Sequence, residues 1–420
     1  MMIERIQEAL KELELQDYLI SDTEEASAEL FFVRKKLDMR RRKNTEKADV
    51  TVFRNGETEK GRMRGASEAG LTPDMDDEEI KAALREAYAS AENAMNPWYE
   101  LYQGTKGEKK DAAPEISLTD AAALMADALY AEDVRNDAFI NSAEIFIEKR
   151  DVRIVSCTGT DVSYTAFSVN GEFVTQCLEP KDVEQHFTFR YDGLETEALK
   201  EKVREALNTV SDRAKAAKAP SAGTYDIVLS GENLAEILSF YTYRSNASLV
   251  YAGYSDYKTG MAVQSAGEGY EKLNLNLLST VPYSSEGIPM KERELLKEGV
   301  LQTLHGTSRF CYYLGCEPTG DYRKTGLHNG TVPFEEMKKG ALYPVTFSDF
   351  QMDPMSGHFM GEIRLAYYYG ENGVEILTGG SINGSLLEKA DELVFSLEQY
   401  KDAAYEGPLA VRIKGVAVAG

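Results

Sequence analysis

The sequence predicts an α+β fold, in which helices are segregated from largely antiparallel sheets. Its 420 residues are enough for two or three domains with proper cores. Apolar residues at helical spacing occur in a few blocks, whereas most of the chain consists of short β-rich runs that end at Gly, Pro or Asn turns. The Ala/Pro/Gly-rich joint at 219–223 interrupts the pattern. We therefore expect an N-terminal α/β domain with a mixed sheet (residues 1–219) and a C-terminal, strand-rich domain with a mostly antiparallel sheet (residues 220–420).

The first hundred residues are expected to place two helices around a set of strands. Ile3, Ile6 and Leu10 lie on one face of a helix over residues 3–16. Four acidic residues at 76–79 fill the first turn of a second helix, where they complement the helix dipole, and this helix runs to about residue 93. Asn-Gly at positions 55 and 56 is the strongest short hairpin signal in this region. The strands are expected at 28–37, 49–54 and 57–66.

Residues 117–217 are expected to add two more helices and several strands. Residues 117–120 have the pattern of a capping box that opens an Ala-rich helix to about residue 130. Leu199, Val203 and Leu207 lie on one face of a helix over residues 195–217. Asn-Gly at 170 and 171 predicts another tight hairpin. The strands are expected at 144–149, 152–156, 162–169, 171–177 and 185–191.

Short strands dominate the rest of the chain. A strand at 225–231 is expected to lead into a helix over residues 233–243, and further short helices are expected at 333–339 and 386–400. Gly-containing pairs predict the connecting turns. These turns are expected at Glu286-Gly287, Asn372-Gly373 and Asn383-Gly384.

The charge balance excludes nucleic acid as a partner. The chain has 47 Lys and Arg against 70 Asp and Glu, a net charge of −23, which repels phosphate backbones. The basic runs at 34–36 and 40–43 are the local exception. We interpret them as the solvated face of a strand pair rather than as a nucleic-acid patch.

The cysteines and the hydropathy pattern predict a soluble protein of the cytoplasm. The four cysteines are too few and too scattered for a disulfide framework. Cys311 and Cys316 are five positions apart, which is not the CxxC spacing of zinc or redox sites. The acidic N-terminal segment lacks the features of a signal peptide, and no apolar run approaches the ~20 residues that span a bilayer. We therefore expect reduced thiols and no membrane contact.

Two Gly-containing motifs in the C-terminal half are specific through their order and spacing. Residues 283–301 read YSSEGIPMKERELLKEGVL, and residues 314–320 read LGCEPTG. Together they resemble the signature of the TldD/PmbA family, whose members are often labelled modulators of DNA gyrase. The likeness covers the whole chain, most strongly after about residue 221. It continues at residues 353–359, 367–375, 381–386 and 415–420.

The resemblance implies a metal site whose ligands this chain has replaced. In TldD-type members a helix that follows a strand carries the pattern HExxxH, in which two histidines hold a metal and the glutamate acts on the bound water. In the equivalent helix here, Ser239, Phe240 and Arg244 stand at these positions. Serine and phenylalanine are not zinc ligands, and arginine is always cationic. We therefore expect no metal, no cofactor and no catalytic residue in this chain.

A second loss agrees with the first. The family's metal site also takes a cysteine near the C-terminus, and here no cysteine follows Cys316. No histidine lies between His186 and His305, so a shift in register does not restore the site. The chain therefore resembles the PmbA (TldE) branch, the non-metal-binding partner that forms a heterodimer with TldD in a metallopeptidase complex.

Isolated polar residues leave an unrecognised active site open as an alternative. His305 near Ser308, and His358 near Asp353, would be the nearest acid–base pairs. An isolated histidine in a loop or strand is more often structural or solvated. Cys157 has no histidine partner visible in the sequence and is interpreted as a small core residue.

A peptide cleft is expected around the degenerate helix. The chain uses 24 Tyr against one Trp. Tyrosine is rigid, wide and polar at one end, so it suits both half-buried strands and peptide-contact surfaces. The candidate lining residues are Tyr243, Tyr251, Tyr254, Glu286, Thr319, Asn329, Ser356 and His358.

These observations favour a cytoplasmic, catalytically silent PmbA/TldE-like subunit that pairs with a TldD-type metallopeptidase or, without one, with itself. Its contribution would be structural, completing an enclosure that admits only unfolded or small peptides to the partner's metal. Two alternatives stay open. The chain is either an active peptidase with an unrecognised site, or a stand-alone peptide-binding homodimer.

Overall fold

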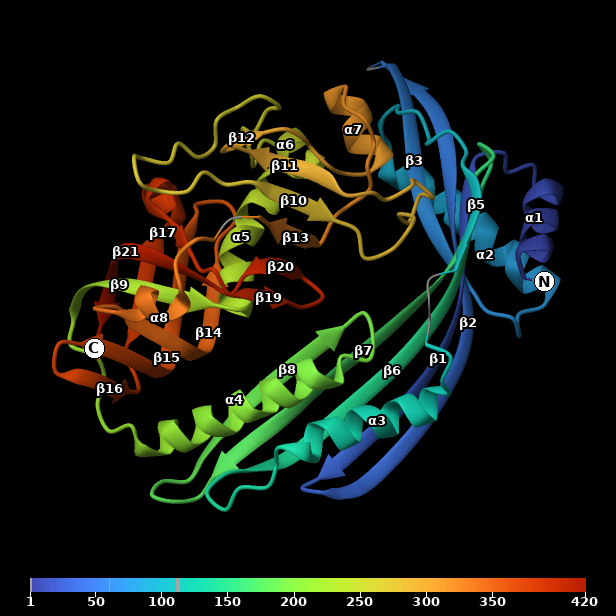
Figure 1. Ribbon diagram of the computed structural model, residues 1–420. Coiled ribbons are helices and arrows are strands. Elements are labelled where there is room, and N and C mark those ends of the chain that lie inside the picture. The colour runs from blue at the N-terminus through green and yellow to red at the C-terminus, as the bar shows by residue number, and fades with distance from the viewer. Residues whose placement is uncertain (1, 60, 111–113, 329) are drawn as a thin grey trace.

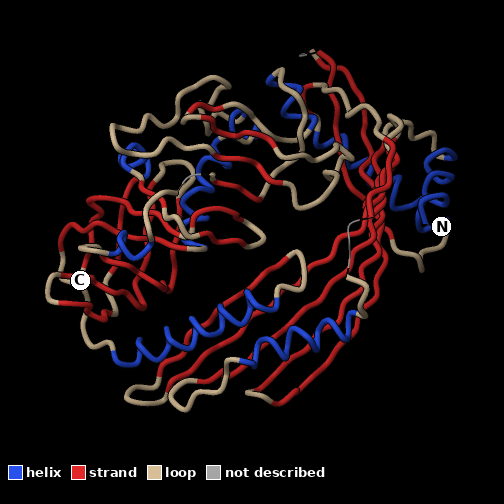
Figure 2. The backbone as a smooth tube through the Cα atoms, in the orientation of Figure 1, coloured by secondary structure: helices blue, strands red, loops and turns tan. Residues whose placement is uncertain are grey.

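The computed structural model describes residues 2–59, 61–110, 114–328 and 330–420 (Figure 1). It confirms the α+β class: a sheet of long strands with helices on one face occupies the N-terminal half, and shorter strands form two sheets in the C-terminal half (Figures 1 and 2). None of the helices in the described part of the chain has the length and apolarity that a bilayer crossing requires.

The N-terminal sheet has eight described strands, and its order is β4-β3-β2-β1-β6-β7-β5, with β8 pairing to β7 beyond the end of β5. All its pairs are antiparallel except β5 with β7. The sheet is therefore mixed. Its strands are β1 Tyr18–Val33, β2 Lys36–Thr58, β3 Gly61–Leu71, β4 Asn96–Pro97, β5 Lys106–Lys110, β6 Phe139–Ser156, β7 Asp161–Cys177 and β8 Val183–Tyr191.

Four helices cover one face of this sheet in two separate groups. Side chains alternate between the faces of a strand, so Ile20 and Ala28 of β1 lie on the same face. Ile20 packs in the core formed with α1 and α2, and Ala28 packs in the core formed with α3 and α4. A stretch of sheet between the two groups is left without a helix over it. The helices are α1 Met2–Glu12, α2 Asp77–Ser90 (continued by the 3₁₀ turn Ala91–Ala94), α3 Leu118–Ala131 and α4 Thr196–Lys215.

The start of α2 forms a full capping box with Asp76 as its N-cap, and the capping box predicted for α3 forms in part. The Asp76 carboxylate accepts hydrogen bonds from the N–H groups of Glu78 and Glu79, and the Glu79 side chain bonds back to the Asp76 N–H. The Ser117 hydroxyl accepts from the Asp120 N–H. These bonds satisfy donors that a helix start would otherwise leave unpaired.

The hairpin turns predicted at Asn55-Gly56 and at Asn170-Gly171 are wrong, because both pairs lie inside continuous strands. Asn55 pairs with Arg64 and Gly56 with Met63, and the chain reverses farther on, between Thr58 and Gly61. Gly171 lies in the middle of β7, where a Cβ atom would come 2.2 Å from the Phe189 ring and 2.5 Å from the Glu144 carbonyl oxygen.

The glycine at position 171 therefore provides room between neighbouring strands rather than a turn. The breaks predicted within β6 and β7 are also absent. Both strands are held continuous because each has partner strands on both sides. The predicted strand 28–37 is also wrong at its end. It is interrupted at Arg34, whose positive φ of 51° forms the turn between β1 and β2.

One sheet of the C-terminal half closes on itself. Its order is β14-β9-β21-β17-β15-β16, β18 pairs to β21, and an additional pairing joins β14 to β15. The second sheet has the order β12-β11-β10-β13-β20-β19. Among the described strands of these two sheets, parallel pairs occur only between β9 and β14 and between β13 and β20, so both sheets are mostly antiparallel as expected. The strands of the first sheet are β9 Gly223–Ser230, β14 Leu342–Met352, β15 His358–Gly370, β16 Gly373–Leu377, β17 Ser381–Ser385, β18 Val394–Phe395 and β21 Ala410–Ala419, and those of the second are β10 Leu275–Leu278, β11 Arg293–Lys297, β12 Val300–Leu301, β13 Lys324–Leu327, β19 Gln399–Lys401 and β20 Tyr405–Pro408.

Short helices connect these strands. The predicted helix over 386–400 is wrong beyond residue 392, where the chain returns to strand in β18 and β19. The predicted turn at Asn383-Gly384 is also wrong: both residues lie in β17, and a Cβ atom at Gly384 would come 2.3 Å from the Phe359 ring. The helices are α5 Glu232–Arg244, α6 Ala247–Tyr251, α7 Ser308–Leu314, α8 Phe334–Lys338 and α9 Leu386–Lys389, which the 3₁₀ turn Ala390–Glu392 continues.

The two halves meet along α7 and along the uncovered face of the N-terminal sheet. Ring contacts join Trp98 to Tyr312 at 5.6 Å and Tyr99 to Tyr313 at 6.0 Å between centroids. Ile154 and Val162 of the sheet pack against Tyr283. Figure 1 shows α7 beside β3 at this junction. Strands β1–β8 pair only among themselves, as do β9–β21, in the part of the chain that is described, while the division into folding units at residue 219 stays a prediction.

Candidate functional site

The helix that would carry a metal site is α5, which follows β9 through Gly231. This glycine has φ 55° and ψ −124°, a conformation that favours glycine and turns the chain sharply from strand into helix. The buried residues of α5 include Leu234, Ile237 and Leu238, which fix the helix against the closed sheet. The predicted strand and helix are therefore both present, with boundaries within a residue or two of those expected.

Phe240 is a core residue. Its side chain is 1% exposed and contacts the Tyr241 ring edge to face at 5.4 Å. It also lies beside Gly357, where an added Cβ atom would be 3.4 Å from the Phe240 ring. A carboxylate at this position would be buried among apolar groups, which strongly disfavours its ionised form.

Arg244 occupies the last turn of α5 and joins it to two loops. Its Nη1 donates to the carbonyl oxygens of Tyr254 at 3.2 Å and Met355 at 3.3 Å, and its Nη2 bonds to the Asp256 carboxylate. The guanidinium also lies 5.1 Å from the centre of the Tyr257 ring. The side chain is 16% exposed. Arg244 is thus a half-buried cation with several partners.

These three positions do not fit a divalent metal. The Ser239 hydroxyl donates to the Glu236 carbonyl oxygen at 2.7 Å, Phe240 offers no donor atom, and Arg244 places a fixed positive charge beside them. Metal ligands in proteins are thiolates, imidazoles, carboxylates and carbonyls, and a neighbouring guanidinium repels the ion. Across the described residues, no three His, Cys, Asp or Glu side chains lie close enough together to hold a metal.

A cavity of about 640 Å³ lies beside α5. Ser239, Thr242 and Tyr243 of the helix line it, while Phe240 and Arg244 do not. Four carboxylates face this cavity against one arginine, so its charge is negative. The charged residues are Glu232, Glu236, Asp321, Asp402 and Arg323.

His305 lines the same cavity, and both of its ring nitrogens have partners. The side chain is 2% exposed; Nε2 donates to the Thr242 carbonyl oxygen at 2.9 Å, and Nδ1 accepts from the Tyr322 N–H at 3.5 Å. Burial lowers the pKa of His305, which favours the neutral ring. Ser308, the predicted partner of His305, instead bonds to Glu286. The structure therefore does not form this acid–base pair.

The candidate cleft residues are spread over several parts of the C-terminal half. Tyr243 lines the cavity beside α5, and its side chain is 54% exposed. Tyr251 contacts Tyr313 of α7 with the two rings tilted by 33° and their centres 4.7 Å apart, and Tyr254 is 58% exposed in the loop after α6. Asn329 lies outside the described residues.

The remaining four candidates have local partners. The Glu286 carboxylate accepts from the Ser308 N–H at 2.8 Å, and burial raises the pKa of Glu286. The buried Thr319 hydroxyl accepts from the Gly306 N–H at 3.1 Å. Ser356 donates to Asp353 in an exposed turn, and this hydroxyl lowers the pKa of Asp353. His358 is exposed at the start of β15, opposite Ser385.

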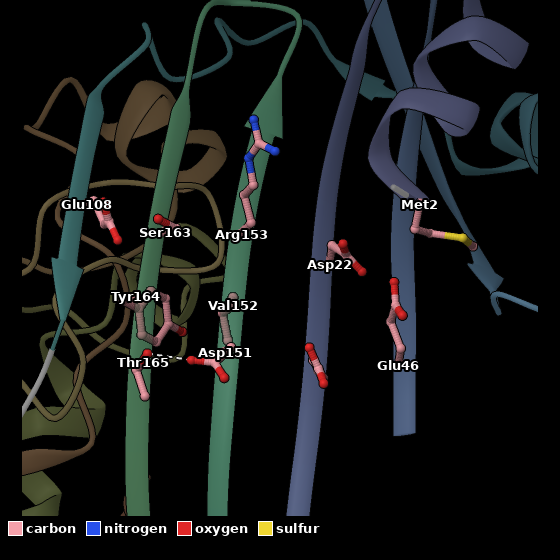
Figure 3. A pocket seen from close by; sticks show the side chains of 11 residues that line it. Met2, Asp22, Glu46, Glu108, Asp151, Val152, Arg153, Ser163, Tyr164 and Thr165 are labelled. Carbon is pink, nitrogen blue, oxygen red and sulfur yellow. Dashed lines mark hydrogen bonds between the residues drawn. The ribbon is translucent and has the colours of Figure 1, made fainter. Parts of the chain in front are cut away.

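A carboxylate-rich hollow of about 510 Å³ lies on the N-terminal sheet (Figure 3). Its β1 residues, Asp22 and Glu24, fall between Ile20 and Ala28, so the hollow lies between the two groups of helices. Glu24 of β1 stands directly opposite both Glu46 of β2 and Asp151 of β6, and Asp22 stands opposite Arg153. Burial, and then the charge of Glu46, raises the pKa of Asp22 to about 6. The sequence signal was the alternation of acidic residues at 22 and 24, which share a face in a strand.

Comparisons with known proteins identify relatives of the fold. Residues 222–420 match the family described as the PmbA/TldA metallopeptidase C-terminal domain. A curated protein from Methanothermobacter thermautotrophicus, called a metalloprotease, is 24% identical over 268 residues, which are 60% of this chain and 52% of that protein. The match therefore spans about half the length of that relative.

Solved structures share the fold over the full length of this chain. TldE from Thermococcus kodakarensis has a TM-score of 0.78 at 14% identity, with 100% of both chains covered. A Thermotoga maritima protein described as a candidate modulator of a DNA gyrase has a TM-score of 0.79 at 15% identity, again with 100% of both chains covered. A protein of the same description from Bacteroides thetaiotaomicron has a TM-score of 0.78 at 14% identity, covering 98% of that protein. At these identities the likeness concerns the fold alone.

Proposed function

Because residues 222–420 belong to the PmbA/TldA metallopeptidase C-terminal domain family, we propose that this chain is a non-catalytic, TldE-like subunit of a TldD/TldE-type metallopeptidase complex. The complex acts on unfolded or small peptides. The chain contributes by completing the enclosure around the partner's metal.

The observation that carries this proposal is the side-chain set of α5. The expected metal-binding positions hold a hydroxyl bonded within its own helix, an aromatic ring in the core and a guanidinium tied to two loops. Each of these side chains packs or bonds within the fold, and a metal ligand in its place would not make these contacts. The helix therefore stands where the resemblance expects the metal-binding helix, but its side chains at these positions have structural roles.

A stand-alone peptide-binding protein is the second candidate, and the cavity beside α5 favours it. About 640 Å³ is within the range of ligand pockets, and its excess of carboxylates suits a cationic group such as a peptide amine. The same cavity would serve peptide recognition within the complex. The two candidates differ in whether hydrolysis requires a partner.

Reconstitution with a TldD-type protein tests the proposal. The chain alone, a TldD-type protein carrying HExxxH alone, and the mixture are compared for cleavage of an unfolded peptide, with a chelator as the control for metal dependence. We expect cleavage from the mixture, association of the two proteins, and neither cleavage nor stoichiometric metal in the chain alone. Chelator-sensitive cleavage by the chain alone would overturn the non-catalytic role. A peptide-binding chain that forms only homodimers would favour the second candidate.

A further inference from the structure

The C-terminus of α7 is a Schellman motif. Gly315 is in the left-handed conformation, with φ 67° and ψ 31°. Its N–H donates to the Tyr312 carbonyl oxygen at 3.2 Å, and the Cys316 N–H donates to the Cys311 carbonyl oxygen at 3.0 Å. These are the two hydrogen bonds that define the motif, and they satisfy carbonyls that the helix end would otherwise leave free.

This motif brings two thiols together. The residue after the left-handed glycine characteristically contacts the residue five positions before it, usually through two apolar side chains. Here both residues are cysteines whose thiols interact with each other, while the Cys311 thiol donates its hydrogen bond to the Gly306 carbonyl oxygen at 3.5 Å. Cys311 is 0% exposed, whereas Cys316 is half-buried. The five-residue separation that is wrong for a CxxC site is therefore the correct separation for contact across a helix end.

The two thiols differ in acidity in a way that suits exchange chemistry. Interaction with the neighbouring Cys311 thiol lowers the pKa of Cys316 to about 7, and the same interaction raises the pKa of Cys311. A thiolate is the nucleophile in disulfide exchange. Near neutral pH the accessible Cys316 is the attacking sulfur, and the buried Cys311 is the resolving one.

We propose that Cys311 and Cys316 form a reversible dithiol–disulfide couple, oxidised by small-molecule disulfides. The Cys316 thiolate attacks one sulfur of the oxidant and releases one thiolate, which leaves a mixed disulfide. Cys311 then loses its proton, attacks the Cys316 sulfur and releases the second thiolate. The protein dithiol is oxidised by two electrons and the small disulfide is reduced to two thiols.

The couple lies on the element that joins the two halves of the molecule. Arg309 donates to the Asn96 side chain, and Tyr313 donates to the Pro97 carbonyl oxygen. A disulfide would fix the last turn of α7, from which the Tyr313 contact arises. The inference concerns the thiols alone, so it does not depend on the proposed subunit role.

Oxidation of the intact, folded chain tests the couple. The reduced protein is incubated with oxidised glutathione at neutral pH, and free thiols, intact mass and a non-reducing peptide map are recorded. We expect two of the four thiols to be lost, a mass lower by two hydrogens, and a link between Cys311 and Cys316. Cys157 and Cys177 serve as internal controls, and they should stay reduced.

Two single variants test the order of attack. Cys311→Ser should accumulate the glutathione adduct on Cys316, because no resolving thiol remains. Cys316→Ser should form neither the adduct nor the internal disulfide at position 311. Four free thiols in the oxidised wild type, a stable adduct without the internal bond, or a link that involves Cys157 or Cys177 would each overturn the proposal. The wild-type peptide map decides the matter even where a variant folds poorly.

Discussion

At the scale of single residues, Asp22 shows how a carboxylate can weaken the fold that contains it. It is half-buried, and its Oδ1 atom is enclosed without a hydrogen-bond partner in the described part of the chain. Glu46 and Glu24 raise its pKa further, and Arg153 opposes them. The residue is ionised at neutral pH in surroundings that disfavour its charge.

We predict that Asp22→Asn stabilises the protein above about pH 6. The pKa is raised from 3.8 to about 6, so the unfolded chain loses this proton first and stability falls as the pH rises between these values. The penalty is then constant at higher pH. The full shift corresponds to about 3 kcal/mol, and solvent screening at a half-buried site reduces the expected gain to roughly 1 kcal/mol.

Urea unfolding at several values between about pH 5 and pH 8 measures this effect. The advantage of Asp22→Asn should grow from the lower value to about pH 7 and then stay level. Asp38→Asn, at an exposed position of β2, removes the same charge and is the matched control. The prediction would be contradicted if the gain in stability of Asp22→Asn shrank as the pH rises. It would also be contradicted if Asp38→Asn gave an equal gain.

We predict that Arg244→Ala destabilises the protein by about 2 to 4 kcal/mol. The substitution removes hydrogen bonds to two carbonyl oxygens and the stacking over Phe240 and Tyr257. Arg244→Lys should recover only part of this loss, since an ammonium cannot reproduce the planar fork.

Asp256→Asn is the control for the ion pair alone. The Asp256 side chain is 71% exposed, so its loss should cost at most about 1 kcal/mol. Urea unfolding of the variants separates the two contributions. If Arg244→Ala were as stable as Asp256→Asn, the guanidinium would not have the structural role that we assign to it.

At the scale of elements, the long strands of the N-terminal sheet depend on glycines that let neighbouring chains approach. Gly171 is the clearest case, because an alanine Cβ would meet the Phe189 ring at 2.2 Å and the Glu144 carbonyl oxygen at 2.5 Å. The backbone oxygen cannot move without breaking the pairing between β6 and β7.

We predict that Gly171→Ala costs at least about 2 kcal/mol through this overlap. Gly193→Ala is the matched control, since its nearest neighbour would be a flexible Glu195 oxygen at 3.9 Å. It should change stability by less than about 0.5 kcal/mol. Thermal or urea unfolding compares the pair, and equal stabilities would show that the strands separate easily at this point.

At the scale of the whole molecule, the C-terminal half presents faces and edges that the chain itself leaves partly uncovered. The second C-terminal sheet ends in β19, which has one partner strand in the described part of the chain, whereas residues 260–263 hydrogen-bond along the outer edge of β12 at the other end. Exposed edges and faces of this kind are commonly covered by association.

We predict a two-fold dimer whose interface exceeds the ~800 Å² of ordinary crystal contacts. In the absence of a TldD-type partner this is a homodimer that mimics the heterodimer, since related subunits present related surfaces. Sedimentation at micromolar concentration should give twice the chain mass of 46.7 kDa. A single species at 46.7 kDa would remove the dimer and much of the case for a partner-subunit role.

The sequence by itself determined the fold class and the positions of the main helices. Helical spacing and end caps are local properties, and they placed α1 to α5 and α8 within a few residues. The absence of histidine from residues 187–304, and so from this helix, is a matter of composition, which no tertiary contact can change.

Only the tertiary structure decided which glycines turn the chain and which side chains meet. Gly171 and Gly384 have the local chemistry of turns, yet each lies in a strand whose neighbours pack against the missing Cβ. Glu24 lies opposite Glu46 of β2 and Asp151 of β6. The register of these strands is set by pairing over the whole sheet. Cys311 and Cys316 meet because Gly315 ends a helix in the left-handed conformation. Spacing along the chain gives the separation of two residues, and the backbone geometry between them decides whether they touch.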